Sequence, residues 1–269
     1  MAVITKITTQ QKKCGRYNIF TDDGHGEKFA FSVDEDVLIK YKLKKGMELD
    51  EFSVLEIHYQ DDIRKAYNLA VSYLARRMRS EQEIRAYLKK KEVEEPVIQE
   101  VIHKLTAQKY IDDQEFANAY VRTQVSTTDK GPELILIELK EKGIGKNAAD
   151  IAMEAFTLEH QLEKAVKLAK KYIGKNSRDS HRVMKQKLES LLIRKGYPFD
   201  IIHRAISELD VQEASDEFEA IRYQWEKLHR KYSRLEGAEY DRKMKQALYR
   251  KGFSFETIER FLAEENNEC

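Results

Sequence analysis

Apolar residues recur along most of this chain at the spacing of one buried helical face. The first such stripe comprises Ala66, Leu69, Ala70, Tyr73 and Leu74, which stand at relative positions i, i+3, i+4, i+7 and i+8. The same spacing returns within residues 116–120, 162–169 and 218–232. The pattern predicts that the chain is helical from residue 61 onward and that four similar helices each open a repeating unit.

A second helix follows each stripe and ends in one shared pattern. A leucine is followed by Lys at the third position, an apolar residue at the fifth and usually Ile at the tenth; the four leucines are Leu88, Leu139, Leu192 and Leu248. These leucines stand 51, 53 and 56 residues apart. A period of this size predicts tandem three-helix units that bury part of their apolar faces on one another.

Glycine follows the lysine of this pattern in three copies, as Gly143, Gly196 and Gly252, and Glu92 takes its place in the first copy. Glycine suits the left-handed position that ends a helix, because it has no Cβ. We therefore expect a mainly α-helical protein in which tandem three-helix repeats form an elongated, curved array. The expected repeats are residues 61–111, 112–157, 158–210 and 211–269.

The first 60 residues have a different pattern and are expected to form a small β-containing module. Three segments, at 3–8, 17–20 and 28–33, are rich in β-branched and aromatic residues that partly alternate with polar ones. The turn-forming residues 22–26 join the second and third segments and predict a hairpin. Residues 34–41 are expected to form a short helix.

Several helix starts carry capping signals. Ser80, with Glu83 three residues later, forms a capping-box pattern, and Pro96 suits a first helical turn. The acidic pairs Asp61–Asp62 and Asp112–Asp113 have the composition of a metal or acid/base pair. Each pair stands just before an expected helix, where carboxylates cap free N–H groups, and we interpret both pairs as caps.

Charge follows the same period, although the whole chain is close to neutral, with 48 basic and 47 acidic residues. Basic and acidic residues number nine and four in 61–91, two and seven in 92–120, 11 and three in 160–197, one and seven in 198–219, ten and four in 222–251, and one and five in 253–269. The second unit departs from this, with five and four in 122–146. Units stacked in register would gather their basic helices on one flank, which suits a repeating polyanion or protein lattice, although such helices are also common as plain solvated faces.

The densest basic clusters are the candidate sites for DNA phosphates or an acidic protein surface, because guanidinium and ammonium groups bind both. The candidate residues are Arg76, Arg77, Arg79, Arg85, Lys89, Lys90, Lys91, Lys185, Lys187, Arg194, Lys195, Arg242, Lys243, Lys245, Arg250 and Lys251. Aromatic residues able to stack bases lie among the last of them, namely Tyr223, Trp225, Tyr232, Tyr240 and Tyr249. Trp225 and Tyr232 also belong to the core stripe, so packing is the preferred interpretation for these two.

Four consecutive apolar residues, Leu134, Ile135, Leu136 and Ile137, exceed one helical face. Neighbouring units are the preferred cover for them. A partner protein is the alternative, because exposed apolar patches often mark interfaces.

No pattern in the chain predicts catalysis, a cofactor or a metal ion. The glycine pairs lack the Lys and Ser/Thr of a phosphate-binding loop, and the seven histidines have neither the spacing nor the cysteine neighbours of a metal site. Cys14 and Cys269 are expected to be free thiols in a reducing cytosol, since the N-terminus shows no secretory leader. No apolar run approaches the ~20 residues of a membrane helix, and we expect a cytoplasmic monomer.

Several stretches, in their order and spacing, resemble the RecX family of regulatory proteins. They are Arg76-Arg77-Met78-Arg79-Ser80-Glu81-Gln82-Glu83-Ile84, Tyr110-Ile111-Asp112-Asp113-Gln114-Glu115-Phe116-Ala117, Lys130-Gly131-Pro132 and Leu139-Lys140-Glu141-Lys142-Gly143-Ile144. The resemblance is strongest over residues 64–144. The later units look like the same repeat at lower similarity, and the β-containing start looks like the extension of longer Gram-positive-type members.

The resemblance implies a non-enzymatic regulator of RecA recombinase in homologous recombination, DNA repair and the SOS response. It implies that the protein lodges in the groove of the RecA–DNA filament and most often inhibits it, with the filament and single- and double-stranded DNA as partners of the basic helices. One departure concerns the second unit: relatives often carry basic residues after the Gly131-Pro132 pair, whereas this chain has Glu133 and the apolar run 134–137. This favours packing or a protein contact for that helix.

Two other functions stay open at this point. The first is a stand-alone DNA-binding helical-repeat protein or repressor, since three-helix units also build helix-turn-helix modules, although no base-reading helix is identifiable. The second is an adaptor whose apolar second-unit helix holds another protein.

Overall fold

The computed structural model describes residues 2–10, 15–176, 178–209 and 217–268, with side chains as far as residue 265. Two compact units are formed: residues 1–116 with 142–144, and residues 117–141 with 145–269. The expected free thiols of Cys14 and Cys269 lie outside the described residues.

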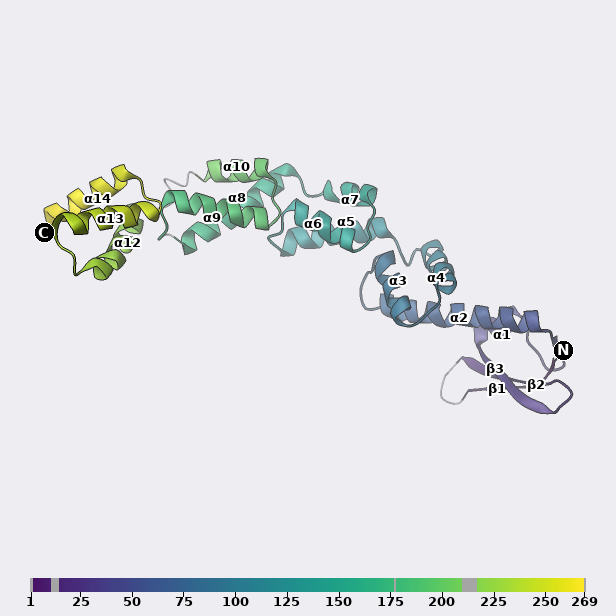
Figure 1. The fold of residues 1–269 in the computed structure, drawn as a ribbon. Helices are drawn as coiled ribbons and strands as arrows, with labels where there is room; N and C mark the ends of the chain where they lie inside the picture. Colours follow the sequence, from purple (N-terminus) through teal and green to yellow (C-terminus); the bar gives the residue numbers. More distant parts are fainter. Residues whose placement is uncertain (1, 11–14, 177, 210–216, 269) are drawn as a thin grey trace. The chain divides into compact units, whose positions relative to one another are not determined.

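An antiparallel sheet opens the first unit (Figure 1). Its strand order is β3-β2-β1-β4, formed by β1 (Ala2–Thr9), β2 (Arg16–Asp22), β3 (Glu27–Asp34) and β4 (Glu48–Leu49). Strands β2 and β3 form the predicted hairpin, and the Asp22 carboxylate accepts hydrogen bonds from the Gly24 and Gly26 amides in its turn. The predicted short helix follows as α1 (Glu35–Lys40).

Helix α2 (Glu51–Leu74) begins ten residues before the predicted helical start at residue 61. Its first half does not show one continuous apolar stripe: Phe52 and Leu55 are exposed, while Ile57 is buried in the core of the strand module. Asp50 caps the helix, because its carboxylate accepts a hydrogen bond from the Ser53 amide at 2.7 Å. The prediction was wrong because this half packs on a sheet rather than on neighbouring helices.

The remaining helices follow in groups of three, each with a first, a second and a third helix. The groups are α2 with α3 (Glu81–Lys90) and α4 (Glu95–Ala107); α5 (Asp113–Thr127), α6 (Pro132–Glu141) and α7 (Lys146–Met153); α8 (Leu158–Lys175), α9 (His181–Arg194) and α10 (Phe199–Glu208); and α12 (Glu217–Tyr232), α13 (Gly237–Arg250) and α14 (Phe255–Glu268). The mainly helical fold with tandem three-helix repeats and an N-terminal strand module is therefore confirmed. The curved, elongated arrangement and the repeat boundaries remain predictions.

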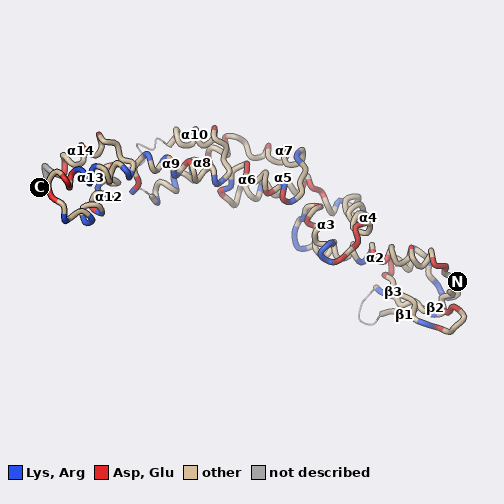
Figure 2. The backbone as a smooth tube through the Cα atoms, in the orientation of Figure 1, with Lys and Arg blue, Asp and Glu red and all other residues tan. Residues whose placement is uncertain are grey.

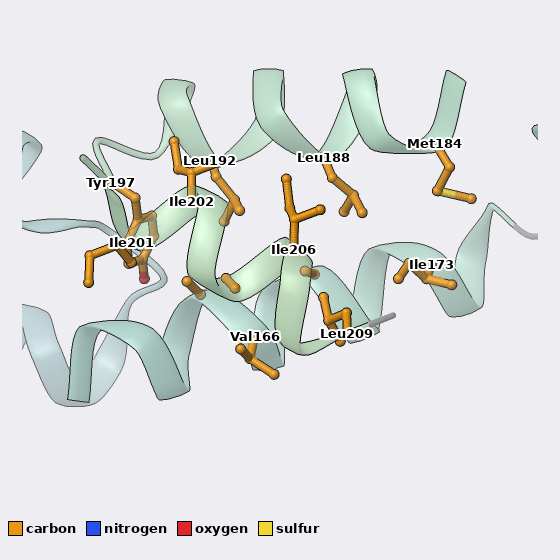
Figure 3. Close-up of a cluster of buried hydrophobic side chains, with 13 residues drawn as sticks. Val166, Ile173, Met184, Leu188, Leu192, Tyr197, Ile201, Ile202, Ile206 and Leu209 are labelled. Carbon is orange, nitrogen blue, oxygen red and sulfur yellow. The ribbon is translucent and has the colours of Figure 1, made fainter. Parts of the chain in front are cut away.

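The first, third and fourth groups each enclose an apolar core, and the third group illustrates the pattern (Figure 3). Leu192 from α9, Ile202 from α10 and Val166 from α8 point into one cluster. The leucines at the equivalent of position 192 are fully buried in all four groups. Complete burial of such a side chain contributes about 2 kcal/mol, which explains why this leucine marks the period.

The predicted helix ends are also confirmed. Gly143, Gly196 and Gly252 have φ angles of +79°, +79° and +91°, and Glu92 adopts +61° in the first group. Ser80 and Glu83 form a complete capping box at the start of α3, and Pro96 lies in the first turn of α4.

Of the two acidic pairs, one caps a helix and the other does not. Asp112 caps α5 as predicted, because its carboxylate accepts from the Gln114 and Glu115 amides at 2.9 and 3.0 Å. Asp113 instead accepts from the amide of Glu81 at 2.9 Å and so caps α3. Asp61 lies inside α2, so the prediction that it precedes a helix is wrong.

The Asp61 carboxylate is buried and joins α2 to the strand module. It lies 2.9 Å from the Arg16 guanidinium and 2.9 Å from the Lys65 ammonium. It also accepts a hydrogen bond from the Asp34 backbone amide at 2.8 Å. Burial alone would raise the pKa of Asp61, but the hydrogen bonds from Arg16, Lys65 and Asp34 hold the pKa below its ordinary value.

The same contact recurs where one group meets the next. The residue at the start of a second helix donates a hydrogen bond to the carbonyl that follows the second helix of the next group. The three contacts are Ser80 Oγ to the Lys142 carbonyl at 2.7 Å, the Gly131 amide to the Lys195 carbonyl at 2.7 Å, and Ser180 Oγ to the Lys251 carbonyl at 2.8 Å. Each satisfies a carbonyl that a helix end would leave without a partner.

Ser180→Ala should lower the free energy of unfolding of the second unit by about 1–2 kcal/mol, because it removes an N-cap and leaves the Lys251 carbonyl without its donor. Urea denaturation followed by circular dichroism measures the loss. Ser190→Ala on the same helix is the control: this exposed hydroxyl bonds back to the Gln186 carbonyl, and its removal should cost almost nothing. Equal losses for the two variants would contradict a special role for Ser180.

Candidate functional site

Several candidate basic residues of the first group form ion pairs with nearby carboxylates. The pairs and their shortest distances are Arg77–Glu83 at 2.8 Å, Arg85–Glu81 at 2.7 Å and Lys89–Glu95 at 3.0 Å. Burial alone would raise the pKa of Glu83, but the hydrogen bond from Arg77 and the charge of Lys142 hold the pKa below its ordinary value. These cations are therefore partly neutralised within the protein.

Arg79 is part of a packed column rather than an open surface. Its side chain is only 12% exposed, and its guanidinium lies 4.1 Å from the centroid of the Tyr73 ring. Tyr73 stacks on Tyr87 with centroids 4.0 Å apart and an angle of 7°, and the Lys91 ammonium lies 5.8 Å from the Tyr87 ring. Cations on aromatic faces are stabilising, so the close contacts of Arg79, Tyr73 and Tyr87 fix α2 against α3, whereas Lys91 remains exposed.

The remaining candidates of the first group, Arg76, Lys90 and Lys91, are exposed. None of them forms an ion pair within the part of the chain that the structure describes. These three cations carry the charge that is open to an external anion in this group.

The later clusters divide in the same way. Lys187 pairs with Asp179 at 2.7 Å, Lys245 lies 3.4 Å from Glu259, and Lys195 is half-buried. The hydrogen bond that Lys187 donates to the Asp179 carboxylate raises the pKa of Lys187. The exposed candidates with no ion pair among the described residues are Lys185, Arg194, Arg242, Lys243, Arg250 and Lys251.

The charge alternation that the sequence predicts is visible along the chain (Figure 2). Lys and Arg gather on second helices such as α13, while Asp and Glu predominate on α14. An array of like charges attracts counterions or polyanions, so these second helices have the charge of an anion-binding surface.

Only two of the four side chains in the apolar run 134–137 are covered by other parts of the protein. Ile135 is fully buried, and Leu134 lies against Gly196, where an added Cβ would come within 2.7 Å of it. Leu136 and Ile137 are exposed. Contacts inside the protein therefore cover half of the run, and a protein contact stays a prediction for the other half.

The aromatic candidates of the last group have different surroundings. Trp225 and Tyr232 pack against the core of α12, α13 and α14, as expected, and the Tyr240 hydroxyl lies 2.7 Å from His229 Nδ1. The Tyr223 ring lies beneath Arg178 and Lys227, at 4.3 and 4.4 Å from its centroid. The hydrogen bond from Lys227 lowers the pKa of Tyr223.

Tyr249 is exposed and stacks on Phe255, a residue that the sequence interpretation missed. The signal for Phe255 is its position: it opens α14 outside the apolar stripe of that helix.

A cavity of about 570 Å³ in the second unit is lined by residues of α5, α8 and the segments next to them, among them Val125, Thr128, His160 and Lys164. The Lys164 ammonium donates to the carbonyls of Val125 and Thr128, so it caps the end of α5. Burial lowers the pKa of Lys164. Among the described residues no group of His, Cys, Asp and Glu is arranged to hold a metal ion, and no helix is long and apolar enough to cross a membrane.

Tandem three-helix groups define a protein built of helical repeats. The chain belongs to the RecX family. The models for the first, second and third three-helix domains of RecX match residues 66–105, 112–153 and both 159–206 and 215–262, and the model for the N-terminal domain of regulatory protein RecX matches residues 2–50.

Relatives of known name agree with this assignment. Regulatory protein RecX of Bacillus velezensis is 47% identical over 98% of this chain and 100% of the relative, and that of Bacillus subtilis is 46% identical over 98% and 99%. A crystal structure of regulatory protein RecX is 39% identical, covers 76% of this chain and 98% of its own, and superposes with a TM-score of 0.67. The relatives are named regulatory proteins, which fits a non-enzymatic role.

Proposed function

We propose that this chain regulates the RecA recombinase by binding in the groove of the RecA–DNA filament, and that its effect is inhibition. Membership of the RecX family supports a regulatory role. The observation that carries the proposal is a recurrence at the period of the repeat: second helices of the first, third and fourth groups carry exposed cations that form no ion pair with the described residues. A repeating cationic surface suits a polymer that presents phosphates or acidic side chains at regular intervals.

The proposed mechanism is competition for sites on the filament. The cations bind DNA phosphates or acidic residues of RecA, and the bound protein slows strand exchange and ATP hydrolysis without using nucleotide itself. In this proposal the protein acts in the cytoplasm as a monomer. Its affinity falls as salt rises, because released counterions drive contacts of this kind.

The test uses reversal of the three open cations of the first group. Arg77 and Arg79 are poor targets, because Arg77 pairs with Glu83 and Arg79 packs on Tyr73, so their replacement would disturb the fold. Arg76→Glu, Lys90→Glu and Lys91→Glu together should raise the concentration needed for half-maximal inhibition of DNA-dependent RecA ATPase by about tenfold, equivalent to about 1.4 kcal/mol of binding free energy. A titration with purified RecA measures it.

A matched control reverses three exposed lysines of the strand module, Lys42, Lys44 and Lys45, and so makes the same change in net charge elsewhere. This control should inhibit RecA as the unmodified chain does. Equal inhibition by the Arg76/Lys90/Lys91 variant would exclude this surface. Equal binding of the unmodified chain to bare and RecA-coated DNA would instead favour a stand-alone DNA-binding protein.

A further inference from the structure

Two surface positions flank the turn between the second and third helices of each three-helix group, and they contact each other in the first and fourth groups. They lie one and seven residues after the buried leucine. The pairs are Lys89 and Glu95, Lys140 and Lys146, Ile193 and Phe199, and Tyr249 and Phe255. The character of the pair therefore changes from charged in the first two groups to apolar or aromatic in the last two.

The structure shows what each kind of pair does. Lys89 and Glu95 form an ion pair at 3.0 Å, which is an ordinary use of two facing surface positions. Tyr249 and Phe255 instead stack, with ring centroids 4.7 Å apart and an angle of 27°. The two rings remain 46% and 56% exposed.

The third group shares this exposure. Ile193 and Phe199 are 48% and 68% exposed. Single exposed apolar residues are normal on a protein surface, but exposure of both members of the pair in two successive groups is a repeated feature.

Backbone and side-chain contacts hold the turn between α13 and α14, which separates Tyr249 from Phe255. Gly252 ends α13 at a φ of +91°, and Phe253 is buried in the core of the group. Ser180 Oγ binds the Lys251 carbonyl, and the Ser254 hydroxyl accepts a hydrogen bond from the Thr257 amide at 3.0 Å. The rings are therefore fixed at the surface before any ligand arrives, which lowers the entropic cost of binding.

Cations accompany each pair. Arg250 and Lys251 directly follow Tyr249, are exposed and form no ion pair among the described residues. Arg194 and the half-buried Lys195 stand at the equivalent places of the third group. A carboxylate also follows each Phe, as Asp200 and Glu256, in the first turn of a helix, where negative charge is stabilised by the helix dipole.

We propose that Tyr249 and Phe255 form a stacking platform for an unpaired base of single-stranded nucleic acid, with Arg250 and Lys251 binding the adjoining phosphates. Every base presents a π-face that stacks on an aromatic ring, whereas a base inside a duplex is already covered by its neighbours. Ile193 and Phe199 form a second apolar surface with a single aromatic ring, and Arg194 and Lys195 follow Ile193 as Arg250 and Lys251 follow Tyr249. Unpaired cations beside the rings favour a polyanion over an apolar protein surface.

The platform goes beyond the proposed regulation of RecA and is tested without RecA. Fluorescence anisotropy of labelled oligothymidylate, and of a duplex of the same length, measures binding by the full chain. Tyr249→Ala with Phe255→Ala should raise the Kd for oligothymidylate about tenfold. The Kd for the duplex should stay within about twofold.

Three comparisons identify the source of the effect. Tyr249→Leu with Phe255→Leu keeps apolar surface but removes both rings, and it should bind oligothymidylate as weakly as the alanine variant. Arg250→Ala should lower the slope of log K against log salt by about 0.7, whereas the aromatic variants should leave this slope unchanged. Phe52→Ala with Leu55→Ala removes an exposed apolar pair from α2 and should bind normally.

Photocrosslinking to an oligonucleotide that contains iododeoxyuridine should label the peptide with Tyr249 or Phe255. Unchanged binding by the alanine variant, or no binding of oligothymidylate by the unmodified chain, would overturn the proposal. An equal loss of duplex affinity in the alanine variant would also overturn the proposal. Full affinity of the leucine variant would show that apolar area, and not ring stacking, is recognised. RecA inhibition by the alanine variant reports on the proposed function separately.

Discussion

Gly131→Ala should lower the free energy of unfolding of the second unit by about 3 kcal/mol or more. An added Cβ at this position would lie 2.3 Å from the Gly196 carbonyl oxygen and 2.7 Å from the Tyr197 amide nitrogen. Both are backbone atoms at the end of α9, so no side chain can rotate away. Relief requires separation of the two groups, which would break the hydrogen bond from the Gly131 amide to the Lys195 carbonyl.

Urea denaturation of the full chain, followed by circular dichroism and by the fluorescence of Trp225, measures this loss. Gly174→Ala is the matched control, because Gly174 lies in α8 with no heavy atom within 4 Å of its Cβ position. Alanine is the better helix former, so the control should stabilise the protein by about 0.5 kcal/mol. Changes of the same sign in the unfolding free energy of the two variants would contradict the close backbone contact of Gly131 with Gly196 as the cause.

Asp61→Asn should destabilise the first unit by about 3 kcal/mol. Asp61 and Arg16 are 2% and 13% exposed, so the substitution leaves a mostly buried guanidinium without its carboxylate. Asp62→Asn is the control at the neighbouring position: Asp62 is exposed and pairs with Lys65 at 2.9 Å, a kind of contact that contributes less than about 1 kcal/mol. A smaller loss for Asp61→Asn than for Asp62→Asn would contradict the assigned role.

The pH dependence gives a second measure of Asp61. Its pKa is held below its ordinary value in the folded protein. A carboxyl group of this kind stabilises the fold above its unfolded pKa, and the contribution is lost as pH falls through the folded pKa. The difference in unfolding free energy between the unmodified chain and Asp61→Asn should therefore be full near neutral pH and shrink below about pH 4. A difference that does not change with pH would exclude the charge as its source.

The sequence predicted what depends on local spacing. Fully buried leucines such as Leu192, left-handed glycines such as Gly252 and the capping box at Ser80 are all set by residues within one helix or turn. The leucine recurs in all four groups and the glycine in three, which made the three-helix period readable without coordinates.

The sequence did not predict contacts between residues of different helices, strands and turns. Asp61 has the same local context as a cap, yet its partner Arg16 lies 45 residues away. Arg79 stands in the densest basic cluster but packs on Tyr73, and Tyr249 meets Phe255 only because a turn brings two helices together. Separation of open cations from packed ones therefore required the structure.

The hydrogen bond that joins successive groups also makes them interchangeable. Its acceptor is always a main-chain carbonyl beside a residue with positive φ, and its donor is a hydroxyl or an amide at a helix start. Gain or loss of one whole group would again place a donor at a helix start beside a main-chain carbonyl, because the acceptor is a backbone atom in all three links. Glu92 fits this view, because it stands in the first group, where its side chain is exposed. The number of groups in such a chain can therefore change in evolution by duplication or deletion of whole segments.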